Sequence, residues 1–188
     1  MRISYASVFY CLLIGIASCR QAAPPVSKAV MLHVNDPQLH LLNGVLYYKE
    51  ALFTGKLSDR WNGNTIRMEQ EYNLGRQQGR EVLYYENGRP EAERWFTKGE
   101  KDSVHLGWWP NGNKKFEYHF SMGNYNGPFR EWYEDGKMLQ ELIYANGTEL
   151  SAKGWRRNGK LYMNYIVKDG RRYGMANANL CYTVETQK

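Results

Sequence analysis

Carboxylates recur through the second half of the chain at a fixed spacing, and paired carboxylates are a common source of general acid and base chemistry. Four of them follow one another at intervals of 24 residues: Glu69, Glu93, Glu117 and Glu141. An active site is a single constellation, whereas a group that recurs in every unit usually serves the structure of that unit. We therefore expect a structural or solvated column, in which each glutamate meets a basic side chain or a backbone donor across a hairpin.

The histidines give no other sign of catalysis, because they show no metal-ligand spacing with cysteine or with one another. These residues are His33, His40, His105 and His119. The sequence also lacks a phosphate-cradling glycine motif and a nucleophile elbow. We predict that the protein is not an enzyme and that it has neither a catalytic residue nor a cofactor or metal site.

The elements that position these residues share the period of the glutamates. An aromatic column recurs every 24 residues, at Tyr72, Phe96, Phe120 and Tyr144. A glycine column does the same, at Gly75, Gly99, Gly123 and Gly147. A turn column keeps the spacing at Asn87-Gly88, Asn111-Gly112 and Asp135-Gly136, and Asn158-Gly159 comes one residue early. Such self-similarity predicts a supersecondary unit that buries its apolar surface against its neighbours.

Each unit reads as a β-hairpin. Residues 79–96 contain two short runs rich in Val, Leu, Tyr, Trp and Phe on either side of Asn87-Gly88. Because Asn-Gly tolerates the positive φ angles of a tight type I′ turn, we expect that turn here, and a second, glycine-containing turn at residues 75–79. The prediction is an all-β fold: an antiparallel meander of hairpins of about 24 residues, built as an elongated single sheet or a solenoid, with a step of about 10 Å per unit.

The amino terminus is typical of an exported protein. Residues 1–18 combine Arg2 with an apolar core, as in a secretory signal peptide, and Ile16-Ala17-Ser18-Cys19 resembles the bacterial lipobox. On this interpretation Cys19 is lipidated, residues 19–41 hold the lipidated cysteine and a tether, residues 42–175 form the repeats and residues 176–188 form a tail. The alternative is a plain signal peptide with an incidental cysteine.

The charge distribution disfavours a nucleic-acid partner, and the cysteine positions disfavour an intramolecular disulfide. The formal net charge of +6 is spread along the chain, with Lys and Arg interleaved with Glu, so no basic block marks a nucleic-acid partner. Cys11 lies in the predicted signal peptide, which leaves Cys181 without an intramolecular disulfide partner in the mature chain. Cys181 is interpreted as a small buried apolar residue, with a reactive or partner-linking thiol as the alternative.

Aromatic side chains are the candidate binding residues. One row places rings at Tyr84, Trp108, Trp132 and, with a one-residue shift, Trp155. The next residue along carries a second row, at Tyr85, Trp109 and Tyr133, which alternation puts on the opposite face of the sheet. Either both rows pack the sheet, or the first row stays exposed and binds a protein partner, a glycan or a lipid headgroup zone.

The repeated segments resemble a known family. Tyr-Tyr-Glu-Asn-Gly at 84–88, Trp-Trp-Pro-Asn-Gly at 108–112 and Trp-Tyr-Glu-Asp-Gly at 132–136 are similar to the MORN-repeat variant of YwqK-like antitoxin proteins, many of which are bacterial lipoproteins. The resemblance covers residues 42–173, although Ser103 and Ser151 stand where two units have glycine. It implies hairpin repeats, a lipid-anchored place in the bacterial cell envelope facing the periplasm, and a toxin-like protein partner.

The sequence thus predicts a non-enzymatic, membrane-anchored repeat protein that acts as a protein-binding or scaffold module, with a toxin-neutralising role implied by the resemblance. The alternative is a structural envelope lipoprotein or a binder of glycan or lipid surfaces.

Overall fold

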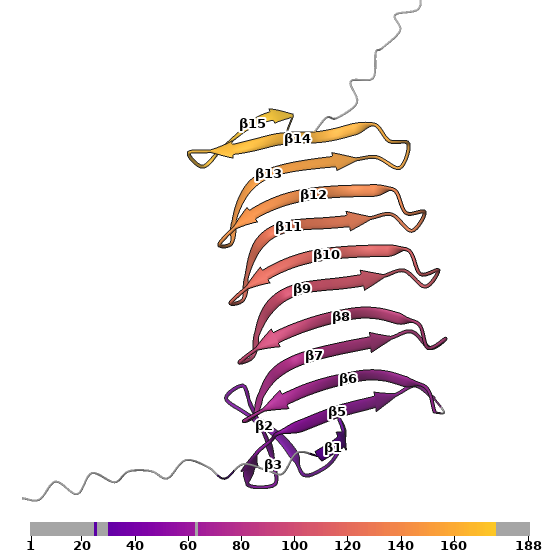
Figure 1. Ribbon diagram of the computed structural model, residues 1–188, viewed down its shortest axis with the longest axis vertical. Helices are drawn as coiled ribbons and strands as arrows, with labels where there is room; N and C mark the ends of the chain where they lie inside the picture. Colours follow the sequence, from indigo (N-terminus) through magenta and orange to yellow (C-terminus); the bar gives the residue numbers. More distant parts are fainter. Residues whose placement is uncertain (1–24, 26–29, 63, 176–188) are drawn as a thin grey trace, which may run out of the picture.

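The computed structural model describes residues 25, 30–62 and 64–175, which form two β-sheets and no helix (Figure 1). No helix among these residues is therefore long and apolar enough to cross a membrane. The long sheet has 12 strands. In spatial order they are β1 (Val30–His33), β5 (Gly55–Arg60), β6 (Ile66–Asn73), β7 (Arg76–Tyr84), β8 (Pro90–Thr97), β9 (Glu100–Trp108), β10 (Lys114–Ser121), β11 (Asn124–Trp132), β12 (Met138–Ala145), β13 (Thr148–Trp155), β14 (Leu161–Lys168) and β15 (Arg171–Met175). The small sheet contains β2 (Leu39–Leu42), β3 (Val45–Tyr48) and β4 (Ala51–Leu52).

From β5 to β15 each strand pairs antiparallel with the next strand along the chain. The prediction of an all-β antiparallel meander is confirmed. The strands run across the long axis of the molecule, so that successive hairpins stack along that axis (Figure 1).

Turns of two kinds join the strands. The type I′ turn predicted at Asn87-Gly88 is wrong, and the second turn predicted at residues 75–79 is centred on Leu74-Gly75 instead, because residues 76–84 form β7. At Asn87-Gly88 the Gly88 N–H donates to the Tyr85 carbonyl and the Tyr85 N–H to the Arg89 carbonyl, 2.9 Å each. Gly88 has φ of 78°, but Asn87 is not left-handed, so this is a type I turn closed by a left-handed glycine rather than a type I′ turn. The same bonds recur at Gly112, Gly136 and Gly159. These three-residue loops lie together on one side of the sheet, here called the loop side (right in Figure 1).

The type I′ turns lie on the opposite side, here called the turn side. There the residue before each glycine and the glycine itself both have positive φ, for example 50° at Leu74 and 76° at Gly75. The same pair of angles occurs at Lys98-Gly99, Met122-Gly123, Asn146-Gly147 and Asp169-Gly170. A non-glycine residue in this region costs about 1–3 kcal/mol unless, like Asn or Asp, it tolerates the conformation.

Backbone hydrogen bonds link each hairpin to its predecessor on the turn side. Gly99 N–H donates to the Gln77 carbonyl, and Gly123 N–H to the Lys101 carbonyl, at 2.8 Å each. Gly75 and Gly147 make the equivalent bonds, to Phe53 and Tyr125. These four turns are therefore fixed by the unit before each of them.

The amino-terminal end carries the hydrophobic core of the described residues. Leu46, Phe53 and Leu57 are buried against partly buried residues of β1 and the small sheet. Strand β1 pairs parallel with β5 and covers the first edge of the long sheet. This cap gives the stack a packed end, as the edge of an open sheet requires.

Beyond the cap, the described part of the sheet is one layer thick, and the main contacts of each strand are with its neighbours in the sheet (Figure 1). Alternation divides the periodic residues between its two faces. The face that carries Glu69, Glu93, Glu117 and Glu141 is called the charge face. The face that carries Tyr72, Phe96, Phe120 and Tyr144 is called the ring face.

Candidate interaction surfaces

The first aromatic row lies on the charge face, at the end of each strand that enters a three-residue loop. Trp132 follows Arg130 by two residues and so shares its face, and Lys114 Nζ lies 5.4 Å from the centroid of the Trp132 ring. Tyr84, Trp108, Trp132 and Trp155 are all half-buried. The four rings thus contact their neighbours and still meet solvent, which differs from a row buried in a core.

The second row holds the first in place. Tyr85 Oη donates to the Trp108 carbonyl at 2.8 Å, Trp109 Nε1 to the Trp132 carbonyl at 3.1 Å and Tyr133 Oη to the Trp155 carbonyl at 3.0 Å. Trp61 Nε1 makes the equivalent bond to the Tyr84 carbonyl, 3.0 Å away. Each ring of the second row therefore fixes the backbone beneath a ring of the first row in the next unit. Sequence reasoning missed this role, although donor and acceptor are separated by almost the same number of residues each time.

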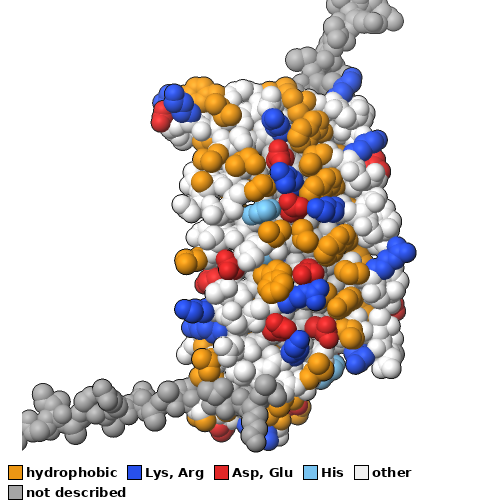
Figure 2. Space-filling view, in the orientation of Figure 1, with side chains coloured by type: hydrophobic (Ala, Val, Ile, Leu, Met, Phe, Trp, Pro, Cys, Tyr) orange, Lys and Arg blue, Asp and Glu red, His pale blue; other side chains and the backbone are white. Residues whose placement is uncertain are grey.

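The glutamate column is built from ion pairs between adjacent strands. Glu93 pairs with Arg80 at 2.8 Å. Arg130 bridges Glu117 at 3.0 Å and Glu141 at 2.8 Å. Figure 2 shows acidic and basic side chains alternating along the middle of this face, with hydrophobic side chains beside them toward the loop side. Three of the four glutamates thus meet a cation across the hairpin, as expected, and within the described residues Glu69 has no ion pair.

Glu117 is the most strongly perturbed carboxylate of the column. Its hydrogen bond with Lys114 Nζ, 2.8 Å long, is the largest cause, and contacts with His119 and Arg130 add to it against the opposing effect of burial. Together they lower its pKa from 4.5 to about 2. The hydrogen bond from Arg80 likewise lowers the pKa of Glu93. Carboxylates held ionised in this way are poor general acids at neutral pH.

The ring face carries a continuous array of aromatic side chains. His105 lies within it, with its ring centroid 5.5 Å from that of Phe96 and 4.6 Å from that of Phe120. The imidazole is 2% exposed and its Nε2 donates to the Trp95 carbonyl at 2.8 Å. Burial lowers the pKa of His105, so it is held neutral. The array continues from Phe120 through Tyr125 to Tyr144, with centroids 4.6 and 5.1 Å apart.

A shallow hollow of about 330 Å³ opens in this array. Its charged members include Arg94, Lys101 and Glu81, and Arg94 pairs with Glu81 at 3.0 Å. Lys101 Nζ lies over the Phe120 ring, 5.2 Å from its centroid. The rings and one ion pair make a polar and aromatic surface, and Tyr118 in its lining donates its hydroxyl to the Glu131 carboxylate.

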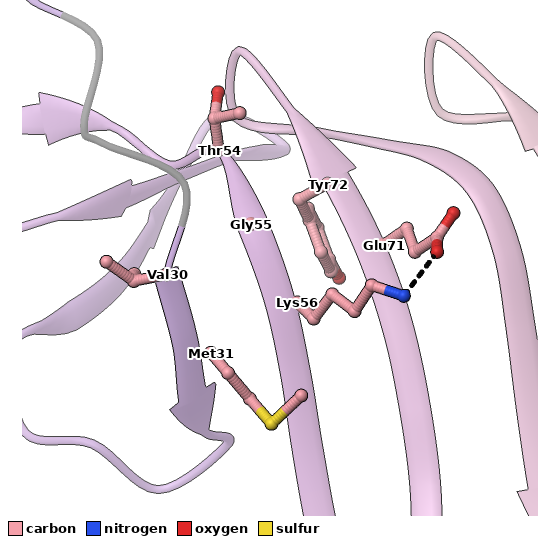
Figure 3. A pocket seen from close by; sticks show the side chains of 7 residues that line it. All are labelled: Val30, Met31, Thr54, Gly55, Lys56, Glu71 and Tyr72. Atoms are coloured by element: carbon pink, nitrogen blue, oxygen red, sulfur yellow. Dashed lines mark ion pairs between the residues drawn. The ribbon is translucent and has the colours of Figure 1, made fainter.

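A second hollow, of about 450 Å³, lies beside the amino-terminal cap (Figure 3). Val30 and Met31 of β1 line one wall, and Lys56 pairs with Glu71 at 2.8 Å on the other. This one ion pair, between two partly exposed side chains, lowers the pKa of Glu71 and raises that of Lys56. Across residues 30–62 and 64–175, no group of three or more His, Cys, Asp or Glu side chains is placed to hold a metal ion.

Several predicted features fall on residues 1–24, 26–29 and 176–188, which the structure does not describe. They are the signal peptide, the lipidation site Cys19, most of the tether before β1, the carboxyl-terminal tail and Cys181.

A comparison of the chain with protein-family models and with curated proteins finds no match.

Proposed function

We propose that this chain is a non-enzymatic, membrane-anchored repeat protein that binds a protein partner through the first aromatic row. The observation that supports this most is the position of Tyr84, Trp108, Trp132 and Trp155 on an uncovered sheet face, each above a backbone that the second row fixes. Pre-organised rings lose little conformational freedom on association, and Trp and Tyr are enriched among the residues that dominate binding energy.

The anchor and the partner class complete the proposal. Lipidation of Cys19 holds the protein on a bacterial envelope membrane, facing the periplasm, and each buried CH₂ group contributes about 0.8 kcal/mol of membrane attachment. The likeness of the repeats to the MORN-repeat variant of YwqK-like antitoxin proteins favours a toxin-like protein, which this chain neutralises by binding it.

A purely structural spacer is the second candidate. It is favoured by the hydrogen bonds that link successive hairpins on both sides of the sheet. A spacer needs no exposed binding row. Removal of the rings should therefore abolish partner binding under the first proposal and leave the function of a spacer unchanged.

The test compares Trp108→Ser combined with Trp132→Ser against the control Trp109→Ser, whose indole lies on the opposite face. The protein is captured with its cross-linked partner from a membrane fraction, and circular dichroism follows its fold. We expect the double variant to keep its β spectrum and lose the partner, and Trp109→Ser to lower the melting temperature while retaining the partner. A partner that remains fully bound to the folded double variant contradicts the proposed binding row.

The anchor has a test of its own. Cys19→Ser should abolish incorporation of radioactive fatty acid and leave an unprocessed or released product. Equal label in the variant and the parent overturns the lipoprotein assignment.

A further inference from the structure

Three consecutive units place an unfavourable residue at the tip of their type I′ turn. The first central position has φ of 50° at Leu74, 53° at Lys98 and 46° at Met122. At the equivalent position two later units have Asn146 and Asp169, which are the residue types that tolerate this conformation. The three adjacent units keep the same backbone with long side chains instead, and bulky residues in strained turns are a mark of functional sites. Leu74, Lys98 and Met122 are called the tip row.

The tip row is rigid at its backbone and open at its side chains. Leu74 N–H donates to Thr54 Oγ1 at 3.0 Å, and Lys98 N–H to Gln78 Oε1 at 2.8 Å. Met122 is 83% exposed and Leu74 is 48% exposed. These apolar side chains therefore project into solvent from fixed positions, and neither contributes to a core.

A hollow lies between each pair of neighbouring tips. The first, of about 500 Å³, separates Leu74 from Lys98 and includes Arg76. The second, of about 360 Å³, separates Lys98 from Met122 and includes Glu100 and Asp102. Because the hollows belong to successive hairpins, their centres are spaced by one unit, about 10 Å.

In the part of the chain that the structure describes, the charged side chains around the hollows have no oppositely charged partner, although Asp102 accepts a hydrogen bond from Thr97 Oγ1 at 3.0 Å. Within the described residues, none of Arg76, Lys98, Glu100 and Asp102 forms an ion pair, whereas most glutamates of the charge face do. The first hollow is therefore basic, and the second has two carboxylates beside Lys98.

We propose that the tip row docks an amphipathic α-helix of the protein partner, an inference that rests on the proposed function. Seven residues of helix rise about 10.5 Å, which matches the spacing of the hollows. Side chains at positions i and i+7 of one helix therefore enter the two hollows, with apolar contacts to Leu74 and Met122. An acidic residue of the helix meets Arg76 and Lys98, and a basic residue one heptad on meets Glu100 and Asp102.

A membrane surface fits these residues less well. Glu100 and Asp102 lie among the tips and offset the attraction of Lys98 and Arg76 for anionic lipid. Separate hollows of opposite charge also suit discrete side chains rather than a uniform layer of headgroups.

The test replaces Leu74, Lys98 and Met122 together by Asn. Because Asn suits the left-handed conformation, this triple variant should melt at a temperature no lower than that of the parent, which separates loss of binding from loss of fold. Lys160→Asn, which removes an exposed cation on the loop side, is the matched control. The probe is a labelled synthetic helical peptide with leucine every seven residues, an adjacent Glu in one heptad and an adjacent Lys in the next.

We expect the triple variant to bind this peptide at least tenfold more weakly than the parent and the Lys160→Asn control. A peptide of the same composition with leucine every five residues should bind the parent weakly. The inference is overturned if the parent binds both peptides equally or binds neither. It is also overturned if the parent does not bind the peptide but is captured by vesicles of three parts anionic to seven parts zwitterionic lipid. Cross-linking in cells separates it from the proposed function: a partner retained by the triple variant contradicts only the tip row, whereas absence of any cross-linked protein on the parent contradicts the proposed function.

Discussion

Glu117 has more basic side chains in contact with it than any other carboxylate of the charge face. Lys114, His119 and Arg130 all contact it, and Arg130 continues to Glu141. The three contacts come from its own strand and the adjacent one, so the carboxylate joins β10 to β11. These contacts lower the pKa of Glu117 in the folded protein. Because this pKa differs between the folded and unfolded chains, the contacts make the free energy of unfolding depend on pH.

Glu117→Gln should destabilise the protein by about 1–2 kcal/mol at pH 7, because the hydrogen-bonded charge is lost and its cationic neighbours are left facing one another. The folded pKa is about 2 and the ordinary value is 4.5, so this stabilisation is fully present above pH 4.5 and is lost as the pH falls through 2. Melting temperatures of parent and variant should therefore differ at pH 7 and converge near pH 2. A difference that stays constant over this range contradicts the assignment.

At the scale of the hairpin, alternation and the position of glycine were enough to predict the antiparallel meander and to place the two aromatic rows on opposite faces. They did not settle the turn types, because Asn-Gly satisfies both a type I′ turn and a type I turn closed by a left-handed glycine. What decides between them is the count of residues between paired strands, and at Leu74-Gly75 or Met122-Gly123 no Asn reveals the type I′ turn. The hydrogen bonds between aromatic rows were also hidden, since they join residues of different units.

Substitutions at two glycines of neighbouring segments should destabilise the protein for different reasons. Gly112 has φ of 92° and nothing within 4 Å of an added Cβ, so Gly112→Val should cost about 1–3 kcal/mol through backbone strain. Gly107 is not left-handed, but a Cβ there would lie 2.1 Å from Phe116 Cε1. Gly107→Ala should cost about 1–3 kcal/mol by overpacking.

A double-mutant cycle measured by chemical denaturation distinguishes the two causes. Phe116→Leu should remove most of the cost of Gly107→Ala and leave that of Gly112→Val unchanged. Equal costs in both backgrounds contradict the ring contact.

At the scale of the molecule, the sheet is a linear array in which each hairpin contacts its two neighbours. The sequence predicted this array from its period. It did not predict the packed core around Phe53, because that core joins β1 and the small sheet to the long sheet through contacts that follow no period. It also left open whether a second layer covers the rings, a question that alternation along one strand does not address.

Deletion of residues 100–123 should leave a folded protein that is shorter by about 10 Å, since one whole hairpin leaves and Gly99 then precedes Asn124 in an equivalent turn. Small-angle scattering and thermal melting check this expectation. Deletion of residues 100–111 is the control. It removes about one strand and so reverses the direction of all the strands that follow, which should prevent cooperative folding.

The direction of the strands also determines how the protein responds to tension. Because the strands run across the long axis, a force between the two ends of the sheet loads the hydrogen bonds of one strand pair at a time (Figure 1). Hairpins then open in sequence from an end, and each 24-residue unit that occupied about 10 Å extends to about 80 Å. If one end is anchored and a partner pulls on the other, the connection between them lengthens in steps at low force, as an extensible tether does, rather than holding them at a fixed distance.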